Sequence, residues 1–327
     1  MFDSNILNER IILMDGAMGT FISSLQLTEN QFKGKRFENT DKPLKDLNDI
    51  LNLTQPEIIT SIHRSYLEAG SDIIETNTLN ANIVSLSAYG CADLCYEINF
   101  QGVQLAKTIA AEYSAKGRQR FVAGAVGTTA KSLTFSAFDG SFTELYQSFL
   151  PQINALMDAE ADLLIVETIY DLLNAEACLT AINDVCKTKK RSIPTILSCT
   201  INNLENRLLS GQTLETFYHT FENRNLLAIG MNCCLGSEQI LPYIRKLSAI
   251  SDIPVYACPN AGLPDKEGSY RQTPSEFVAS IEQMLKGGFV NIVGGCCGTT
   301  PEHIKLIAEK VNLYSPHPIQ KLANPKE

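Results

Sequence analysis

Two adjacent cysteines, Cys296 and Cys297, lie within the glycine-rich segment Gly294–Gly298. Neighbouring Cα atoms across a trans peptide are about 3.8 Å apart, whereas unstrained disulfides begin at roughly 4.4 Å, so these two thiols are poor disulfide partners. The surrounding glycines let the backbone bend until both side chains point toward one place. Adjacent, unpaired thiols of this kind are suited to binding a soft metal ion.

A third thiol, Cys233, follows an aliphatic run that ends at Asn232. Zinc favours thiolate ligands, and three protein ligands leave one tetrahedral position open, as catalytic zinc sites require. The paired Cys-x-x-Cys spacings of structural zinc sites do not occur in the chain. The residues therefore predict a catalytic zinc site on Cys233, Cys296 and Cys297.

Two points about this site stay open at the level of sequence. Cys234 directly follows the predicted ligand Cys233, so the residue order alone does not say whether it contributes. The segment Gly294–Gly298 is also typical of a phosphate-binding loop, because barrels often bind phosphate through backbone amides after their last two strands. We interpret Cys258 as a core residue, since a fourth thiolate would leave no position for a substrate.

Eight aliphatic runs alternate with helical patterns along the chain and are the elements that must position these thiols. The runs span residues 11–15, 73–77, 121–127, 163–168, 195–200, 227–232, 255–258 and 291–294. Apolar strands that alternate with helices are typical of a parallel sheet covered by helices. The sequence therefore predicts an α/β fold, a (β/α)8 TIM barrel over residues 1–312, with the zinc site at the carboxyl ends of the strands. The alternative is a doubly wound open sheet, and the proline-rich residues 313–327 are expected to form a linker-like tail.

The carboxyl ends of these runs carry acidic side chains as well as thiols. Asp15 ends the first run, Glu75 lies near the end of the second, and Glu167 lies near the end of the fourth. The active sites of such barrels are built from residues at the carboxyl ends of the strands. The long, charged connection 21–52 should lie across the same mouth, where long loops are usually functional.

Composition excludes several classes of function. The chain of 327 residues has a formal net charge of −9 and no long block of basic residues. These features argue against nucleic-acid binding. Its first ten residues do not form a signal sequence, and no run of about 18 apolar residues occurs, so we expect a cytoplasmic protein without a membrane segment. Ten cysteines in such a chain are expected to be reduced thiols.

Several motifs together resemble the homocysteine S-methyltransferase family. The likeness covers residues 1 to about 312 and rests on Met14–Thr20, Ala69–Thr78, Asn232–Cys233, Pro259–Gly262 and Gly294–Thr299. A narrower set is similar to the N-terminal homocysteine-binding module of cobalamin-dependent methionine synthase. That set comprises Gly34–Phe37, Asn48–Asp49, Leu209–Thr213 and Asn260–Pro264.

The resemblance implies a methyltransferase that binds zinc on the three cysteines and activates homocysteine as a zinc thiolate. The acids that match Asp15 and Glu167 contact homocysteine in the family, and Glu75 is a third candidate for its ammonium group. Backbone amides from Gly16 to Thr20 are candidates for its carboxylate. Asn260 is a candidate oxygen ligand of zinc in the substrate-free state.

The resemblance also implies a methyl donor that this chain does not hold. We expect methylcobalamin on a partner, together with cobalamin-binding and methyltetrahydrofolate-binding modules or subunits, because no counterpart of these modules and no Asp-x-His-x-x-Gly signature occurs here. The alternative within the enzyme class is a stand-alone methyltransferase that uses betaine or S-methylmethionine. The alternative of another class is a non-catalytic module that binds zinc or thiols.

Overall fold

The computed structural model describes residues 2–129, 131, 140–201 and 207–319. Within this part of the chain, eight parallel strands form one sheet in the order β1-β8-β7-β6-β5-β4-β3-β2. The strands are β1 (Ile12–Leu13), β2 (Ile73–Glu75), β3 (Phe121–Gly127), β4 (Leu163–Ile169), β5 (Thr195–Cys199), β6 (Ala228–Gly236), β7 (Val255–Asn260) and β8 (Ile292–Val293). Because the first strand pairs with the last, the sheet curves into a nearly closed barrel, which confirms the predicted TIM barrel over the open sheet.

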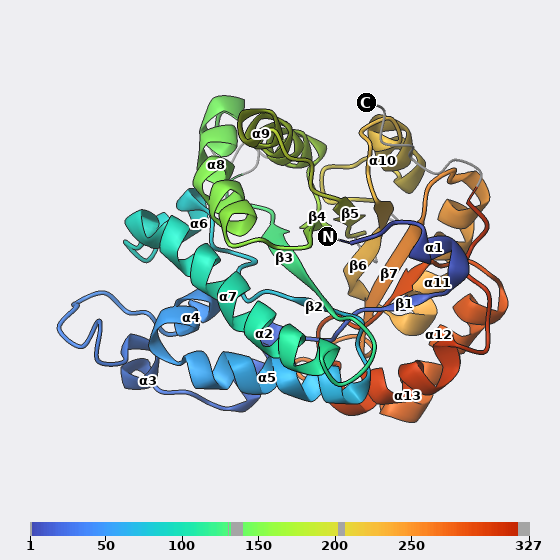
Figure 1. The fold of residues 1–327 in the computed structure, drawn as a ribbon, viewed down its shortest axis with the longest axis horizontal. Helices are drawn as coiled ribbons and strands as arrows, with labels where there is room; N and C mark the ends of the chain where they lie inside the picture. The colour runs from blue at the N-terminus through green and yellow to red at the C-terminus, as the bar shows by residue number, and fades with distance from the viewer. Residues whose placement is uncertain (1, 130, 132–139, 202–206, 320–327) are drawn as a thin grey trace.

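Helices form a ring around these strands (Figure 1). The larger helices are α5 (Pro56–Ala69), α7 (Cys95–Ser114), α8 (Phe142–Asp158), α9 (Leu172–Lys189), α10 (Leu214–Phe221), α11 (Ser237–Ile250), α12 (Pro274–Lys286) and α13 (Pro301–Val311). The connection after β1 contains α2 (Met18–Ser24), α3 (Glu29–Lys33) and α4 (Leu51–Thr54), while α1 (Ile6–Glu9) precedes β1 and α6 (Ile83–Ser87) follows β2. Proline stands in the first turn of α5, α12 and α13, where its missing N–H costs nothing.

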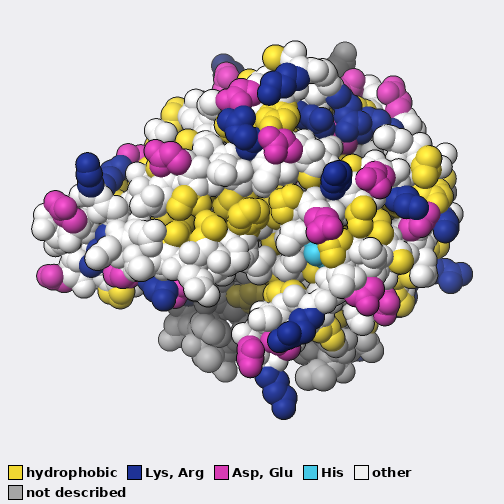
Figure 2. Space-filling view, turned by 90° about the horizontal axis from the view of Figure 1, so that it is seen from below, with side chains coloured by type: hydrophobic (Ala, Val, Ile, Leu, Met, Phe, Trp, Pro, Cys, Tyr) yellow, Lys and Arg dark blue, Asp and Glu magenta, His cyan; other side chains and the backbone are white. Residues whose placement is uncertain are grey.

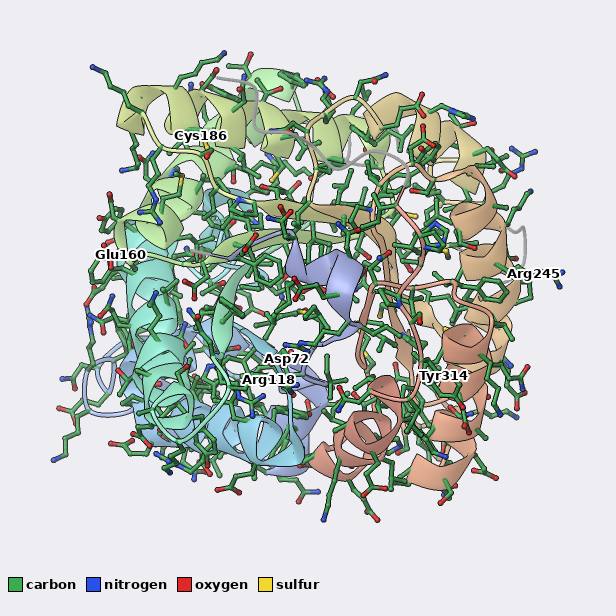
Figure 3. All side chains as sticks on the ribbon, turned by 45° about the vertical axis from the view of Figure 1, so that its right-hand side comes forward. Asp72, Arg118, Glu160, Cys186, Arg245 and Tyr314 are labelled. Carbon is green, nitrogen blue, oxygen red and sulfur yellow. The ribbon has the colours of Figure 1, made fainter. Side chains whose placement is uncertain are left out.

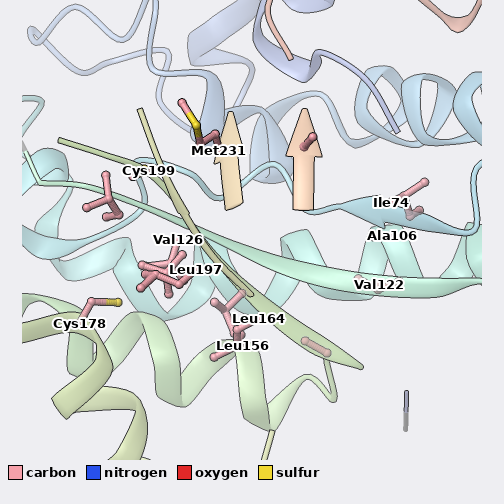
Figure 4. Close-up of a cluster of buried hydrophobic side chains, with 14 of the residues drawn as sticks. Ile74, Ala106, Val122, Val126, Leu156, Leu164, Cys178, Leu197, Cys199 and Met231 are labelled. Carbon is pink, nitrogen blue, oxygen red and sulfur yellow. The ribbon is translucent and has the colours of Figure 1, made fainter. Parts of the chain in front are cut away.

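Apolar side chains fill two layers. Between strands and helices, Leu164 and Leu197 pack in the same buried cluster as Leu156 of α8 and Cys178 of α9 (Figure 4). Inside the barrel a second cluster forms, and Phe2 closes its amino end by packing edge-on against Phe121, with ring centroids 4.9 Å apart. Both layers consist of closely packed apolar side chains, so the strands have a fixed register from which side chains can project into the mouth.

The start of the predicted tail packs against the barrel. The amide of His317 donates to the carbonyl of Val290 at 3.0 Å, and the hydroxyl of Tyr314 donates to Glu282 of α12 at 2.6 Å. Ile319 contacts the cluster inside the barrel. Residues 320–327 lie outside the described residues.

Charged side chains are mixed on the face shown in Figure 2, where lysines and arginines alternate with aspartates and glutamates and no broad patch of one sign forms. The residues that the structure describes include no helix both long and apolar enough to cross a bilayer.

β1 and β2 are not paired by a regular ladder of backbone hydrogen bonds, and Asp72 bridges this seam between them. Its amide donates to the carbonyl of Leu13 at 2.7 Å, and its carboxylate accepts the amide of Leu13 at 3.0 Å. Three arginines surround this fully buried carboxylate, with nitrogen–oxygen distances of 2.7 Å for Arg10, 2.7 Å for Arg118 and 3.6 Å for Arg120. Asp72 and Arg118 lie beside each other in Figure 3.

Replacing Asp72 with asparagine should lower the free energy of unfolding by about 3 kcal/mol, because it leaves the three guanidinium groups without their counter-charge. Chemical denaturation would measure the change. The matched control is Glu112→Gln, which breaks an exposed pair with Arg64 and should hardly change the midpoint. Equal midpoints for the two variants would show that Asp72 does not secure the seam.

Candidate metal centre

Three sulfur atoms meet at the mouth of the barrel. The Sγ atoms of Cys233, Cys296 and Cys297 all lie within 4.8 Å of one another, and those of Cys233 and Cys297 are 3.6 Å apart. Zinc–sulfur bonds of about 2.3 Å place the sulfurs of a tetrahedral site about 3.8 Å from each other. The cluster therefore has the spacing that a metal ion bound by three cysteines requires, and these are the three cysteines that the sequence predicts.

A bulge at the end of β6 turns Cys233 into the mouth. The pairing of β6 with β7 shifts between Asn232 and Gly236, and Cys233 and Cys234 both adopt positive φ angles, 58° and 54°. Left-handed backbone in a residue other than glycine costs about 1–3 kcal/mol and is typical of functional sites. Cys234 is exposed and is not one of the three sulfurs of the cluster, so the structure favours Cys233 as the ligand from this segment.

The loop after β8 holds the other two thiols. A side chain at Gly295 would approach Thr299 to 2.5 Å, which explains the glycine. The amide of Gly295 donates to the carbonyl of Asp15 at 3.1 Å, and that of Cys296 donates to the carbonyl of Pro259 at 2.8 Å. Because these amides already have partners, the loop is poorly suited to binding phosphate, and the structure disfavours that alternative.

Two hydroxyls join this loop to the segment after β1. The amide of Gly298 donates to Oγ1 of Thr20 at 3.1 Å, and the amide of Ala17 donates to Oγ1 of Thr299 at 3.1 Å. Thr299 in turn donates to the carbonyl of Cys296 at 2.7 Å. The cysteine loop and the Gly16–Thr20 segment therefore form one wall.

The three acids predicted from the strand ends lie together beside the sulfurs. Burial, and then the charge of Glu75, raise the pKa of Asp15 well above its usual value. Burial and the neighbouring Glu75 likewise raise the pKa of Glu167, and burial raises that of Glu75. Glu75 donates its amide to Asp15 at 2.9 Å and shares a side-chain hydrogen bond with Glu167. Such a group retains protons when it is empty and gains from a cationic ligand.

A cavity of about 210 Å³, open at the mouth, connects the acids with the sulfurs. Glu75, Glu167 and the three cysteines line it, and its described lining contains no lysine, arginine or histidine. The Gly16–Thr20 segment forms another side, where the first turn of α2 presents amides that no side chain caps. A ligand with an ammonium group, a carboxylate and a thiol would find a complementary partner for each group here.

Asn232 is the residue of the site that sequence reasoning missed. Its Nδ2 atom donates to Glu167 at 2.7 Å and to Thr168 at 2.9 Å, and it lies 3.9 Å from the sulfur of Cys296. Its Oδ1 atom accepts the hydroxyl of Ser198 at 2.7 Å and the amide of Thr168. Asn232 therefore links the acids to the thiols. Its position directly before the predicted ligand Cys233 could have identified it as a site residue.

Asn260 is outside the lining of the cavity, whereas Cys258 is part of that lining. Asn260 is buried at the end of β7, and its Oδ1 atom has no hydrogen-bond partner among the described residues. The role of Asn260 as a zinc ligand in the substrate-free state stays a prediction. Cys258 is buried in β7, and its sulfur would lie 3.0 Å from a side chain at Gly294, so it packs between the strand and the loop.

The mouth of this (β/α)8 barrel presents three thiols that could hold a soft metal ion, with three buried carboxylates beside them, and the carboxyl ends of the strands are where barrel enzymes place their active sites. The sequence model of the homocysteine S-methyltransferase family matches residues 12–311. This chain therefore belongs to the homocysteine S-methyltransferase family and is a methyltransferase.

Solved structures share the fold. The homocysteine methyltransferase MmuM from Escherichia coli, in its metallated form, superposes with a TM-score of 0.72 at 22% identity, covering 94% of this chain and 98% of that chain. Its oxidized form gives 0.71 at 22% identity, with 92% and 96% covered, and its apo form gives 0.63 at 21% identity, with 92% and 95% covered. These likenesses independently support the barrel architecture.

Proposed function

We propose that this chain is a zinc-dependent homocysteine S-methyltransferase whose zinc ligands are Cys233, Cys296 and Cys297. The observation that carries the proposal is that three thiols at zinc-binding distances and a buried acidic group face the same cavity. Three cysteine ligands leave one tetrahedral position free for a substrate sulfur.

Zinc at this position would supply a positive charge that deprotonates the thiol of homocysteine. A thiol with a pKa near 8.5 is only about 3% thiolate at pH 7, so full deprotonation raises the reactive fraction roughly 30-fold. The remaining acceleration must come from the protein, which holds the acceptor sulfur in place.

The residues of the chain would bind the amino-acid part of homocysteine. Asp15, Glu75 and Glu167 face its ammonium group, and amides from Gly16 to Thr20 face its carboxylate. No cationic side chain lines the described part of the cavity, so backbone amides are the available donors for that carboxylate. Asn260 would offer zinc an oxygen when homocysteine is absent. In this proposal residues 1–312 form the catalytic barrel and residues 313–327 a linker-like tail.

We propose methylcobalamin, held by a cobalamin-binding partner module or subunit, as the methyl donor, with a methyltetrahydrofolate-binding partner behind it. The motifs similar to cobalamin-dependent methionine synthase support this choice. One observation favours a second candidate, a small onium donor such as betaine or S-methylmethionine: the cavity is lined by acids without cationic side chains.

Parallel assays of the zinc-loaded protein with homocysteine and each of methylcobalamin, betaine and S-methylmethionine test the donor. We expect methionine to form from methylcobalamin at a rate at least about tenfold above the rates with the other two. A faster reaction with either onium compound would replace the donor assignment. The non-catalytic alternative would be supported if no donor gave methionine and homocysteine left the spectrum of the cobalt-substituted protein unchanged.

A further inference from the structure

The side-chain amide of Asn232 bridges three neighbouring strands at the mouth of the barrel. Asn232 lies in β6 and is fully buried, and its Oδ1 atom accepts the hydroxyl of Ser198, in β5, at 2.7 Å. The same oxygen accepts the backbone amide of Thr168, in β4, at 2.9 Å. None of these three residues is a predicted metal ligand or substrate-binding residue, and of the three only Thr168 lines the cavity.

These two donors decide which way the amide of Asn232 faces. A backbone N–H can only donate, so the side-chain oxygen of Asn232 must be the atom that lies against the amide of Thr168. Nδ2 consequently faces the other way, where it donates to Oε2 of Glu167 at 2.7 Å and to Oγ1 of Thr168 at 2.9 Å. Both ends of the amide have partners in this orientation, and a turned amide would lose them.

The backbone that carries Glu167 depends on the same amide. Thr168 has a φ of +57°, and the pairing of β4 with β5 shifts between Val166 and Ile169. Left-handed backbone in a β-branched residue persists only where the surrounding structure holds it. Asn232 bonds to both the backbone amide and the hydroxyl of Thr168, so it supplies hydrogen bonds at the point where the regular ladder is interrupted.

Asn232 also fixes the carboxylate of Glu167 itself. Its Nδ2 atom occupies Oε2, which leaves Oε1 of this buried residue for interactions within the cavity that Glu167 lines. A hydrogen bond donated to a carboxylate stabilises its charged form. Asn232 therefore both orients Glu167 and favours the charge state that suits a cationic ligand.

We propose that Asn232 is a positioning residue for Glu167 and that Ser198 holds Asn232 in the required orientation. In the proposed function, on which this inference rests, Glu167 binds the ammonium group of homocysteine. The relay Ser198–Asn232–Glu167 then determines how strongly the site prefers an amino-acid thiol to a thiol that lacks the ammonium group.

Ser198→Ala tests the relay without changing Asn232, Glu167 or the thiols. Isothermal titration calorimetry of the zinc-loaded protein would measure the Kd of homocysteine and that of 4-sulfanylbutanoate, which is homocysteine without its ammonium group. We expect the Kd of homocysteine to rise about three- to tenfold, roughly the effect of losing one neutral hydrogen bond, and the Kd of 4-sulfanylbutanoate to change by less than about twofold. The matched control is Ser251→Ala, which removes a buried hydroxyl bonded to the carbonyl of Ile253 at 2.7 Å and should leave both Kd values unchanged.

A double-mutant cycle shows whether Ser198 acts through Glu167. In the Glu167→Gln background the carboxylate is absent, so adding Ser198→Ala should change the Kd of homocysteine by less than about twofold. A second variant, Asn232→Asp, replaces the donor to Glu167 with an oxygen. It should raise the Kd of homocysteine at least as much as Ser198→Ala does, again with little effect on 4-sulfanylbutanoate.

Three outcomes would overturn the inference and leave the proposed function standing, since homocysteine would still bind. They are equal weakening of both ligands in Ser198→Ala, the same weakening of homocysteine in the Glu167→Gln background, and Kd values that match those of Ser251→Ala. Failure of the unaltered, zinc-loaded protein to bind homocysteine would overturn the proposed function and this inference together.

Discussion

Replacing Cys296 with serine is expected to remove zinc and methyl transfer together. The hydroxyl is a much poorer zinc ligand than a thiolate, and two remaining cysteines do not hold zinc in a three-ligand catalytic site. Changes in groups that merely support zinc ligands already cost 10–100-fold in affinity, so loss of a ligand should weaken zinc binding by more than about 100-fold. Zinc content after dialysis and the rate of methionine formation measure the two effects.

The matched control for this change is Cys234→Ser. Cys234 is adjacent to a predicted ligand but exposed and outside the cluster, so its variant should keep one zinc per chain and its turnover. Stoichiometric zinc with full turnover in Cys296→Ser would refute the ligand assignment. Loss of zinc in the control would instead show that Cys234 takes part in the centre.

Replacing Glu167 with glutamine should raise the KM for homocysteine by roughly 10- to 150-fold, the range that follows from losing one hydrogen bond to a charged group. Glutamine is isosteric and can still accept the hydrogen bond from Asn232, so the zinc content should stay at one per chain. Steady-state kinetics with varied homocysteine measures the change. Glu215→Gln, on the surface of α10, is the control and should leave KM unaltered.

The pH dependence follows from the same acids. Because burial and mutual repulsion raise the pKa values of Asp15, Glu75 and Glu167 in the empty site, the group retains protons at pH values where free carboxyl groups are ionised. Homocysteine needs the ionised acids, so its affinity should increase as the pH rises through these raised pKa values and fall as the pH drops below them. Glu167→Gln should weaken this dependence by removing one titrating group. Identical pH profiles in the two proteins, with identical KM, would show that Glu167 does not contact the ammonium group.

The barrel could be predicted because its strands are buried on both faces and are therefore continuous aliphatic runs. A turn signal on either side of each run marks where the strand begins and ends. The runs at 11–15 and 291–294 were longer than the strands themselves, β1 and β8, which have two residues each. The difference has a physical cause. Asp72 completes the seam beside β1 through a side chain, and glycine-rich loop backbone replaces the end of β8.

The site residues could be predicted where a reactive residue type coincides with the carboxyl end of a predicted strand. Cys233, Glu167 and Asp15 come directly from the carboxyl ends of strands, where barrel chemistry is located. The bulge that turns Cys233 inward could not be foreseen, because positive φ angles in two consecutive cysteines contradict local preference.

The wall formed by Thr20, Gly298, Ala17 and Thr299 joins residues separated by 278 and 282 positions. A ribosome makes the chain from its amino end, so the Gly16–Thr20 segment emerges long before the loop that must pair with it. The complete set of three thiols exists only after residue 297 has been synthesised, and the wall around them only after residue 299. A nascent chain therefore displays at most one of the three sulfurs during most of its synthesis, so that in the proposed function zinc would bind only once the barrel can close around it.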